Sequence, residues 1–409
     1  MNSRTLASAL LLLSACASEL DAQDVSGEDE TEAAGARAID PTHGGLGELC
    51  SPAGACDGRL ICGSTGRCLD PIAATAPWLE SFQACDSNDP DCNVCANHVK
   101  QQFDDAFAGQ MRWDSASWGF NWETNYPPSN REPDNVFEGH VQGFARTNRD
   151  PYRFVGSYSD ETGGNGGIFF IHRDDDGHKR LRYLHTARHA HPSGVSVLGR
   201  FVAFSDAANT VRLIDMNRID EAHLIDFVAP GMSRAGGGLG LTKLANNGWL
   251  LVVSPKGSSD GNDREVRFYH LSGSILDPVV KSVGIWDYEQ PDSWQGDYRY
   301  TENLTVIPEC GTGDVYVVNA SGDDRLLGRG YFLLSKVIQR PGAGLGLKPL
   351  RAYHMDQEQS NCHLRSAATA WIDGHHNLQL LCHERKSING VFDGNADNMR
   401  FRHGYNYAD

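Results

Sequence analysis

Two histidines, His189 and His191, stand just before a Pro-Ser-Gly turn and an apolar run, in the stretch TARHAHPSGVSVLGRFVAF. Polar side chains at the start of a strand are available for binding, because loops rather than other strands surround them. Similar polar residues precede apolar runs elsewhere in the chain. On this basis the candidate binding residues are His140, Gln142, His189, His191, Arg234, Glu302, His363 and Arg365.

These residue types suit more than one chemistry. If His140, His191 and His363 converge, their imidazoles could ligate a divalent metal, with Glu302 as a fourth ligand or a base. The same set could instead bind a small anionic or sugar ligand through His, Arg and Tyr donors. A third alternative is structural, in which these groups satisfy strand-end backbone and bridge water. The cofactor is therefore unknown, with a divalent metal as one alternative.

No catalytic motif decides between them. The chain contains no phosphate-binding Walker loop and no H-E-x-x-H zinc motif, and its one match to G-x-S-x-G, at residues 257–261, lies in an acidic, glycine-containing turn segment. Catalytic residues are therefore unknown, and the sequence leaves open whether the protein is an enzyme.

The elements that must position these residues repeat along the chain. From about residue 137, four-run units rich in Val, Ile, Phe and Tyr follow one another, with turn residues between the runs. Such units are typical of β-propeller blades. The units open at GHVQGFAR, HPSGVSVL, GGGLGLTKL, TENLTVIPE and HLRSAATAWID. The sequence predicts an all-β, five-bladed propeller over residues 113–409, with a six-bladed ring or a sandwich as alternatives.

The fifth unit has only three runs before the chain stops, so a strand from elsewhere must complete it. Residues 113–126, in which Trp118, Phe120 and Trp122 alternate with smaller residues, are the expected closing strand. The first strand of each propeller blade lines the central channel. Aligning the units on their first strands therefore places the candidate residues around the mouth of that channel.

The sequence has eleven cysteines. Without Cys16, ten remain, an even number that could form five disulfides. Cys50, Cys56, Cys62 and Cys68, six residues apart, lie in a polar, glycine-rich segment over 47–70 that resembles the cysteine-rich knots of the Dickkopf N-terminal type. That resemblance implies two disulfides, and a Cys₄ zinc site is the alternative.

Residues 71–112 form a linker and a helix, with an apolar stripe at Val94, Val99, Phe103 and Phe107. Cys85, Cys92 and Cys95 are expected to pair among themselves and with one of Cys310, Cys362 and Cys382, pinning the helix to the main domain.

The first residues indicate export. Arg4 precedes the apolar run Leu6 to Leu13, which is too short to span a bilayer and reads as a signal peptide over 1–15. The motif Leu13-Ser14-Ala15-Cys16 resembles the lipobox of bacterial lipoproteins. That resemblance implies lipidation of Cys16, a membrane partner through the lipid anchor, and a place in the bacterial cell envelope, at the outer membrane or cell surface. The alternative is an ordinary signal peptide cut near Ala17.

The acidic character of the chain limits the kinds of partner that we expect. Residues 16–46 are acidic and contain no aromatic residue, so they are expected to form a disordered tether. A formal net charge of −17 with no basic cluster argues against nucleic acid. We expect a monomeric, membrane-anchored binding module with an unknown small-molecule or protein ligand. The alternatives are a structural envelope component or an extracytoplasmic propeller enzyme, either a metal-dependent hydrolase or oxidoreductase or a glycosidase.

Overall fold

The computed structural model divides the chain into two compact units, residues 1–41 and 42–409. The predicted signal peptide, Cys16 and most of the tether belong to the first unit and lie outside the described residues. The structure describes residues 61–62, 68–69, 95–108, 114–115, 120–121, 140–147, 152–159, 166–173, 179–186, 192–205, 210–219, 225–228, 237–244, 248–254, 265–287, 303–322, 329–340, 343–356, 368–383, 387–388, 391–392, 398–399 and 401–403.

The repeated units of the sequence fold into antiparallel sheets in chain order. The first sheet has the order β5-β6-β7-β8, and the second has the order β12-β11-β10-β9. Their strands are β5 (His140–Arg146), β6 (Tyr152–Ser159), β7 (Gly166–Arg173), β8 (Lys179–Thr186), β9 (Ser193–Leu198), β10 (Phe201–Ser205), β11 (Thr210–Asp215) and β12 (Ile225–Val228). Each strand coincides with a run that the sequence predicts.

The third and fourth units join edge to edge in one sheet of order β13-β14-β15-β16-β20-β19-β18-β17. A single residue pair, Gly284 and Gly344, links β16 to β20. A Cβ at Gly284 would lie 2.4 Å from the Leu345 carbonyl oxygen, so both strands need glycine at this point. The strands are β13 (Leu239–Lys243), β14 (Trp249–Val253), β15 (Glu265–Ser274), β16 (Asp277–Asp287), β17 (Asn303–Pro308), β18 (Val315–Gly322), β19 (Arg329–Arg340) and β20 (Gly344–Asp356).

The last unit is completed from the other end of the repeat region. Its order is β21-β22-β26-β3, in which β3 (Asp114–Ser115) pairs with β26 (Phe401–His403). The fourth strand therefore comes from the segment before the first sheet, where the sequence analysis places the closing strand. The remaining strands are β21 (Ala368–Ile372), β22 (Leu378–His383), β4 (Phe120–Asn121), which pairs with β25 (Asn398–Met399), and β23 (Ser387–Ile388), which pairs with β24 (Val391–Phe392).

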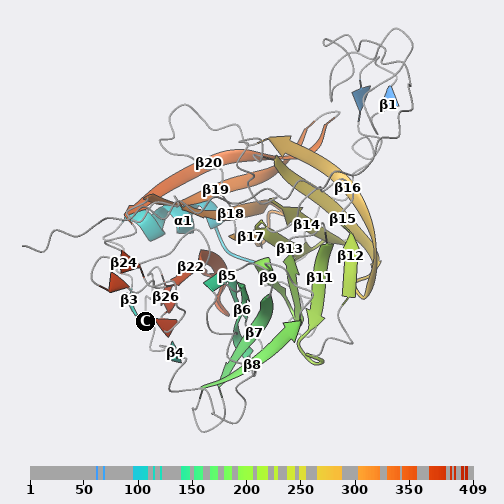
Figure 1. The fold of residues 1–409 in the computed structure, drawn as a ribbon. Helices are drawn as coiled ribbons and strands as arrows, with labels where there is room; N and C mark the ends of the chain where they lie inside the picture. The colour runs from blue at the N-terminus through green and yellow to red at the C-terminus, as the bar shows by residue number, and fades with distance from the viewer. Residues whose placement is uncertain are drawn as a thin grey trace, which may run out of the picture. The chain divides into compact units, whose positions relative to one another are not determined.

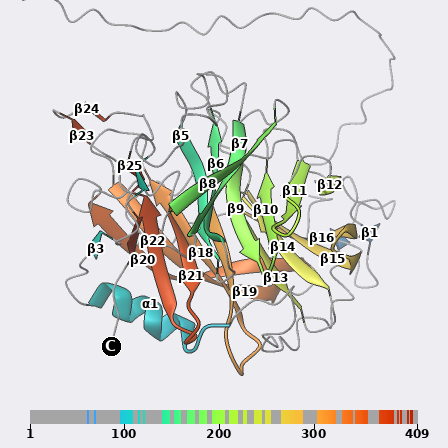
Figure 2. The ribbon, with the colours of Figure 1, turned by 90° about the horizontal axis from the view of Figure 1, so that it is seen from below.

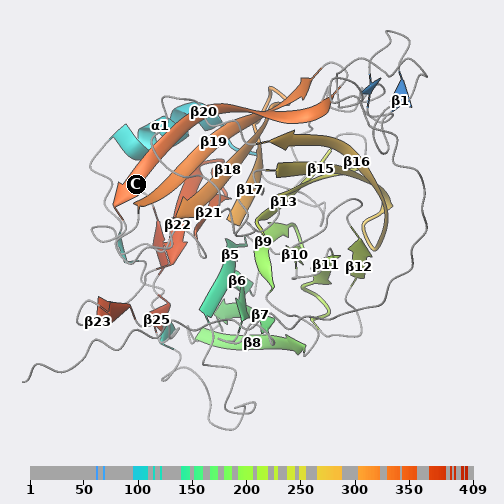
Figure 3. The same cartoon turned by 45° about the horizontal axis from the view of Figure 1, so that its top comes forward.

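The first strands of the units form a closed ring. Going around it, β5 lies beside β9, β9 beside β13, β13 beside β17, β17 beside β21, and β21 beside β5 again. Figures 1 and 3 show these strands near the middle, with β8, β12, β16 and β20 farther out. This radial arrangement confirms the predicted all-β fold of the propeller type.

Apolar layers fill the spaces between neighbouring sheets. One cluster joins the first two sheets through residues such as Val155 and Val202, and another joins the second and third through Leu213 and Leu251. Because the second strand of each unit lies between two such layers, all five residues of β10 and of β14 are buried. These strands therefore read as continuous apolar runs rather than alternating ones.

The short helix α1 (Val99–Ala108) forms where the apolar stripe predicts it. Val99 and Phe103 are fully buried in a cluster shared with strands of the fourth unit and with the last sheet. Phe107 stacks on Tyr353 at 4.2 Å between ring centroids. Figure 2 shows α1 beside β22. Among the described residues, no helix has the length and apolarity needed to cross a membrane.

An ion pair fixes the outer face of α1. The Asp104 carboxylate accepts hydrogen bonds from Arg351 Nε at 2.8 Å, Lys100 Nζ at 3.0 Å and Tyr353 Oη at 3.1 Å. Burial raises the pKa of Asp104, but these hydrogen bonds outweigh it and hold the pKa below its ordinary value.

The predicted cysteine-rich knot is described only at two short strands. β1 (Ile61–Cys62) pairs antiparallel with β2 (Cys68–Leu69), with Cys62 and Cys68 as register partners. Cys50 and Cys56 lie outside the described residues, so the pairing of the four cysteines stays a prediction.

Candidate functional site

The start of the inner strands is tied together across the ring. The Oδ1 atom of Asn303, the first residue of β17, accepts a hydrogen bond from the backbone N–H of Phe144 in β5 at 3.2 Å. In the ring, β5 has β9 and β21 as its neighbours, so this bond reaches a strand that is not adjacent. Asn303 is 1% exposed. Its side chain therefore occupies the interior of the ring.

Glycines allow the inner strands to approach closely at the same end. Gly194 in β9 has a φ of +59°, and a Cβ there would lie 2.3 Å from the Gly237 carbonyl oxygen. A Cβ on Gly143 would lie 3.0 Å from the backbone nitrogen of Gly194. Backbone, rather than side chains, thus lines much of this contact between β5, β9 and the start of β13.

Side-chain hydrogen bonds join strands that belong to different sheets. The Ser205 hydroxyl donates to the Gly237 carbonyl oxygen at 3.1 Å, which links β10 to the start of β13, and it lies 2.9 Å from the Ser193 carbonyl oxygen within its own sheet. The Thr305 and Thr369 hydroxyls lie 3.0 Å apart and link β17 to β21. These bonds hold the inner strands in place where no sheet ladder connects them.

Three buried side chains near this end keep unused hydrogen-bonding capacity. Ser157 Oγ, Ser193 Oγ and Asn303 Nδ2 make no hydrogen bond to any residue that the structure describes. Ser157 and Ser193 are fully buried. They belong to one neighbourhood, because Ser157 Oγ lies 2.9 Å from where a Cβ of Gly143 would stand and Gly143 faces Gly194. A buried donor without a partner costs about 1 to 3 kcal/mol, so each of these groups calls for a partner that the described residues do not supply.

An arginine is held between aromatic rings at the other end of β5 and β21. The Arg146 guanidinium carbon lies 3.7 Å from the ring centroid of Trp371 and 5.6 Å from that of Phe154. The arrangement is a cation–π contact that links the first sheet to the last.

The predicted site residues fall largely outside the described part of the chain. His140 and Gln142 lie in β5, but their side chains are outside the described residues. The others that lie outside are His189, His191, Arg234, Glu302, His363 and Arg365. Their convergence, and a divalent metal on His140, His191 and His363, stay predictions.

Asn303 and Ser157 were not predicted as site residues. Asn303 directly follows Glu302, and its only signal is its position at the start of the TENLTVIPE run. Ser157 carries no signal, because it lies on a second strand and reaches the site only through the register with Gly143.

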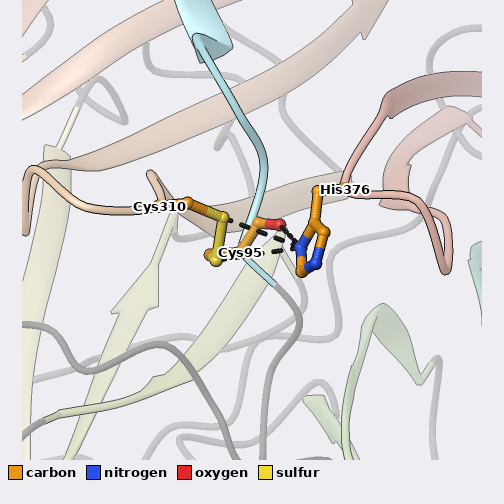
Figure 4. A group of neighbouring side chains, drawn as sticks. All are labelled: Cys95, Cys310 and His376. Carbon is orange, nitrogen blue, oxygen red and sulfur yellow. Dashed lines mark hydrogen bonds between the residues drawn. A yellow bond between two sulfur atoms is a disulfide. The ribbon is translucent and has the colours of Figure 1, made fainter.

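A second cluster of reactive side chains lies where the segment before α1 meets the sheets. Cys95 and Cys310 form a disulfide with Cα atoms 5.1 Å apart. His376 Nδ1 lies 3.9 Å from Cys95 Sγ, 3.7 Å from Cys310 Sγ and 2.9 Å from the Cys95 carbonyl oxygen, as Figure 4 shows.

The predicted crosslink between the helix segment and the main domain is confirmed, with Cys310 as the partner of Cys95. Cys382 is also disulfide-bonded. Cys85, Cys92 and Cys362 lie outside the described residues.

Acidic and aromatic groups surround this crosslink. Glu309 Oε1 accepts the N–H of Val99 at 2.9 Å, which caps the first turn of α1. Burial, together with the nearby Glu309 and Asp314 carboxylates, raises the pKa of Tyr316 to about 12. The tyrosine therefore stays protonated at physiological pH.

Comparison with known proteins gives only distant likenesses. No family model matches the chain, and no curated protein matches it. Among solved structures, xylan beta-1,4-xylosidase from Bacillus halodurans C-125 aligns with a TM-score of 0.39 and 12% identity, over 64% of this chain and 52% of that one. The hemagglutinin-neuraminidase of parainfluenza virus 5 aligns with a TM-score of 0.33 and 9% identity, over 62% of this chain and 75% of that one. This chain thus spans about half the length of the xylosidase, and neither likeness bears on what it binds.

Proposed function

We propose that the protein is an exported lipoprotein, anchored through Cys16, whose five-bladed propeller binds a small, oxygen-rich ligand at the end of the ring where the inner strands begin. The observation that carries the binding proposal is the set of three buried, unpartnered groups on Ser157, Ser193 and Asn303. The five-strand inner ring supports the blade count.

The chemistry of these groups indicates the class of ligand. The hydroxyls of Ser157 and Ser193 and the Asn303 Nδ2 group can all donate hydrogen bonds. Together they favour a ligand rich in acceptor oxygens, such as a sugar or a carboxylate. His140, His191 and Glu302 border the same strand starts in sequence and would extend the site toward solvent. A few convergent polar groups on a rigid scaffold are the usual pattern of a small-molecule site.

We expect Asn303→Asp to weaken ligand binding at least about tenfold, since the loss of one or two hydrogen bonds in a buried site costs about 1.4 kcal/mol or more. The aspartate keeps an oxygen for the Phe144 N–H but lacks the Nδ2 donor. The measurement is a thermal-shift screen of the full chain with monosaccharides, uronic acids and short carboxylates, followed by calorimetry of the compounds that stabilise it.

Asn217→Asp is the matched control, because Asn217 is exposed in the turn after β11. It should bind like the wild type. If no compound stabilises the wild type, or if Asn303→Asp binds as tightly as Asn217→Asp, the binding site proposed here is wrong.

The anchor is tested separately. We expect Cys16→Ser to abolish incorporation of labelled palmitate and to move the protein out of the membrane fraction, because several acyl chains contribute about 0.8 kcal/mol for each buried CH₂ group. Asp21→Asn, in the tether, should leave lipidation unchanged. Label on the Cys16→Ser protein would contradict the lipobox interpretation.

A further inference from the structure

Three metal-binding atoms converge at the crosslink beside α1. The sulfurs of Cys95 and Cys310 and Nδ1 of His376 all lie within 4.8 Å of one another. They come from three segments far apart in the chain, which Figure 4 shows meeting side by side. Cys95 is buried, Cys310 is half-buried and His376 is exposed. One side of the cluster therefore faces solvent.

The backbone holds these segments together independently of the disulfide. Ala96 N–H donates to the Pro308 carbonyl at 2.9 Å, and Cys310 N–H donates to the Ala96 carbonyl at 2.9 Å. On the other side, Asn97 N–H donates to the His376 carbonyl at 3.0 Å. Each bond involves a residue of the cluster or its immediate neighbour. When the disulfide is reduced, the two thiols and the imidazole are therefore kept close to each other.

The turn that carries His376 is itself fixed. Asp373 Oδ1 accepts the N–H groups of His375 at 2.8 Å and of Asn377 at 2.9 Å. Gln102 of α1 accepts the Leu378 N–H through Oε1 at 2.5 Å. His376 has a φ of +66°, a conformation that costs a residue other than glycine energy and that these contacts maintain. The imidazole is thus presented to the sulfurs by a rigid turn.

We infer that, in the reduced protein, Cys95, Cys310 and His376 bind one Zn²⁺ ion, with solvent as the fourth ligand. With Zn–S bonds of about 2.3 Å and Zn–N bonds of about 2.0 to 2.1 Å, tetrahedral geometry requires donor atoms about 3.5 to 3.8 Å apart. The S···Nδ1 distances of 3.7 and 3.9 Å already approach that spacing. Only the two sulfurs have to separate. This site is distinct from the ligand site proposed above and does not depend on it.

The chemistry balances in two steps. A dithiol reductant supplies two electrons and two protons, so the Cys95–Cys310 bond breaks into two thiols while the reductant becomes a disulfide. Binding of Zn²⁺ then releases one proton from each thiol, because thiolates are the ligands. The neutral imidazole keeps its single proton, which moves to Nε2, and Nδ1 exchanges the Cys95 carbonyl for the metal. The ion thereby replaces the lost covalent crosslink.

The test titrates Co²⁺, as a spectroscopic substitute for Zn²⁺, into the full chain after anaerobic reduction with dithiothreitol and removal of the reductant. Three proteins are compared: wild type, His376→Ala and His375→Ala. All three keep every cysteine, so thiols elsewhere contribute equally. His375 is the exposed neighbour and serves as the matched control. We expect thiolate-to-cobalt absorption in the wild type and in His375→Ala, and at least a tenfold weaker affinity in His376→Ala.

A second variant removes the need to reduce the other disulfides. Cys95→Asp cannot form the crosslink but offers a carboxylate ligand, so the oxidised variant should bind Zn²⁺ and melt at a higher temperature in its presence. Adding His376→Ala to this variant should abolish that rise. The inference would be overturned if His376→Ala and His375→Ala bound Co²⁺ with equal affinity. It would also be overturned if Zn²⁺ did not raise the melting temperature of the Cys95→Asp protein.

Discussion

Gly194→Ala will destabilise the protein by about 2 to 5 kcal/mol, seen as a fall in the denaturant midpoint. Two effects add. A residue with a Cβ costs about 1 to 2 kcal/mol in the left-handed conformation, and Gly194 has a φ of +59°. The new methyl group would also meet the Gly237 carbonyl oxygen at 2.3 Å and the Leu239 nitrogen at 2.8 Å, and overpacking against backbone costs about 1 to 3 kcal/mol.

Gly311→Ala separates these two effects. Gly311 has a φ of +77°, but a Cβ there would meet no atom within 4 Å. Its substitution should therefore cost only the conformational part, about 1 kcal/mol. Equal midpoints for the two variants would show that β9 does not approach β13 as closely as the structure has it.

Replacing Cys95 and Cys310 together by alanine should lower the free energy of unfolding by about 3 to 5 kcal/mol. The disulfide joins residues 215 positions apart, so it restricts the unfolded chain strongly, and the loop-entropy relation gives about 5 kcal/mol for such a loop. The native contacts of α1 remain, because Phe103 stays buried and Asp104 keeps its three partners.

The measurement is a guanidinium titration of the double variant beside His376→Ala, which retains the disulfide. His376→Ala should lose no more than about 1 kcal/mol, as for an ordinary partly exposed hydrogen bond. A double variant as stable as the wild type would show that the disulfide does not restrict the unfolded chain as the loop-entropy relation requires.

Local patterns predicted the strands well, for a physical reason. Runs such as FVAFS and WLLVV are β-branched or aromatic and are bounded by turn residues, so their strand character depends on near neighbours only. The apolar stripe through Val99 and Phe103 fixed α1 in the same way. The pairing of Cys95 with Cys310 was less accessible, because three distant cysteines fitted the pattern equally.

The candidate site depended on contacts that no local pattern contains. Asn303 reaches Phe144 across 159 positions of sequence, and the two meet only because the inner strands close into a ring. His376 likewise reads as a turn residue until the turn is placed against Cys95. Residue types at strand starts could be predicted, whereas the partners of each side chain required the closed arrangement of the sheets.

The pairing of Asp114–Ser115 with Phe401–His403 has a consequence for how the chain reaches its native state. The last sheet cannot be completed until the chain has been synthesised through residue 403. Native contacts of such long sequence separation make folding slow, since loop closure must be paid before they form. Until β3 pairs, β26 has an open edge, and an unpaired strand edge is a template for aggregation.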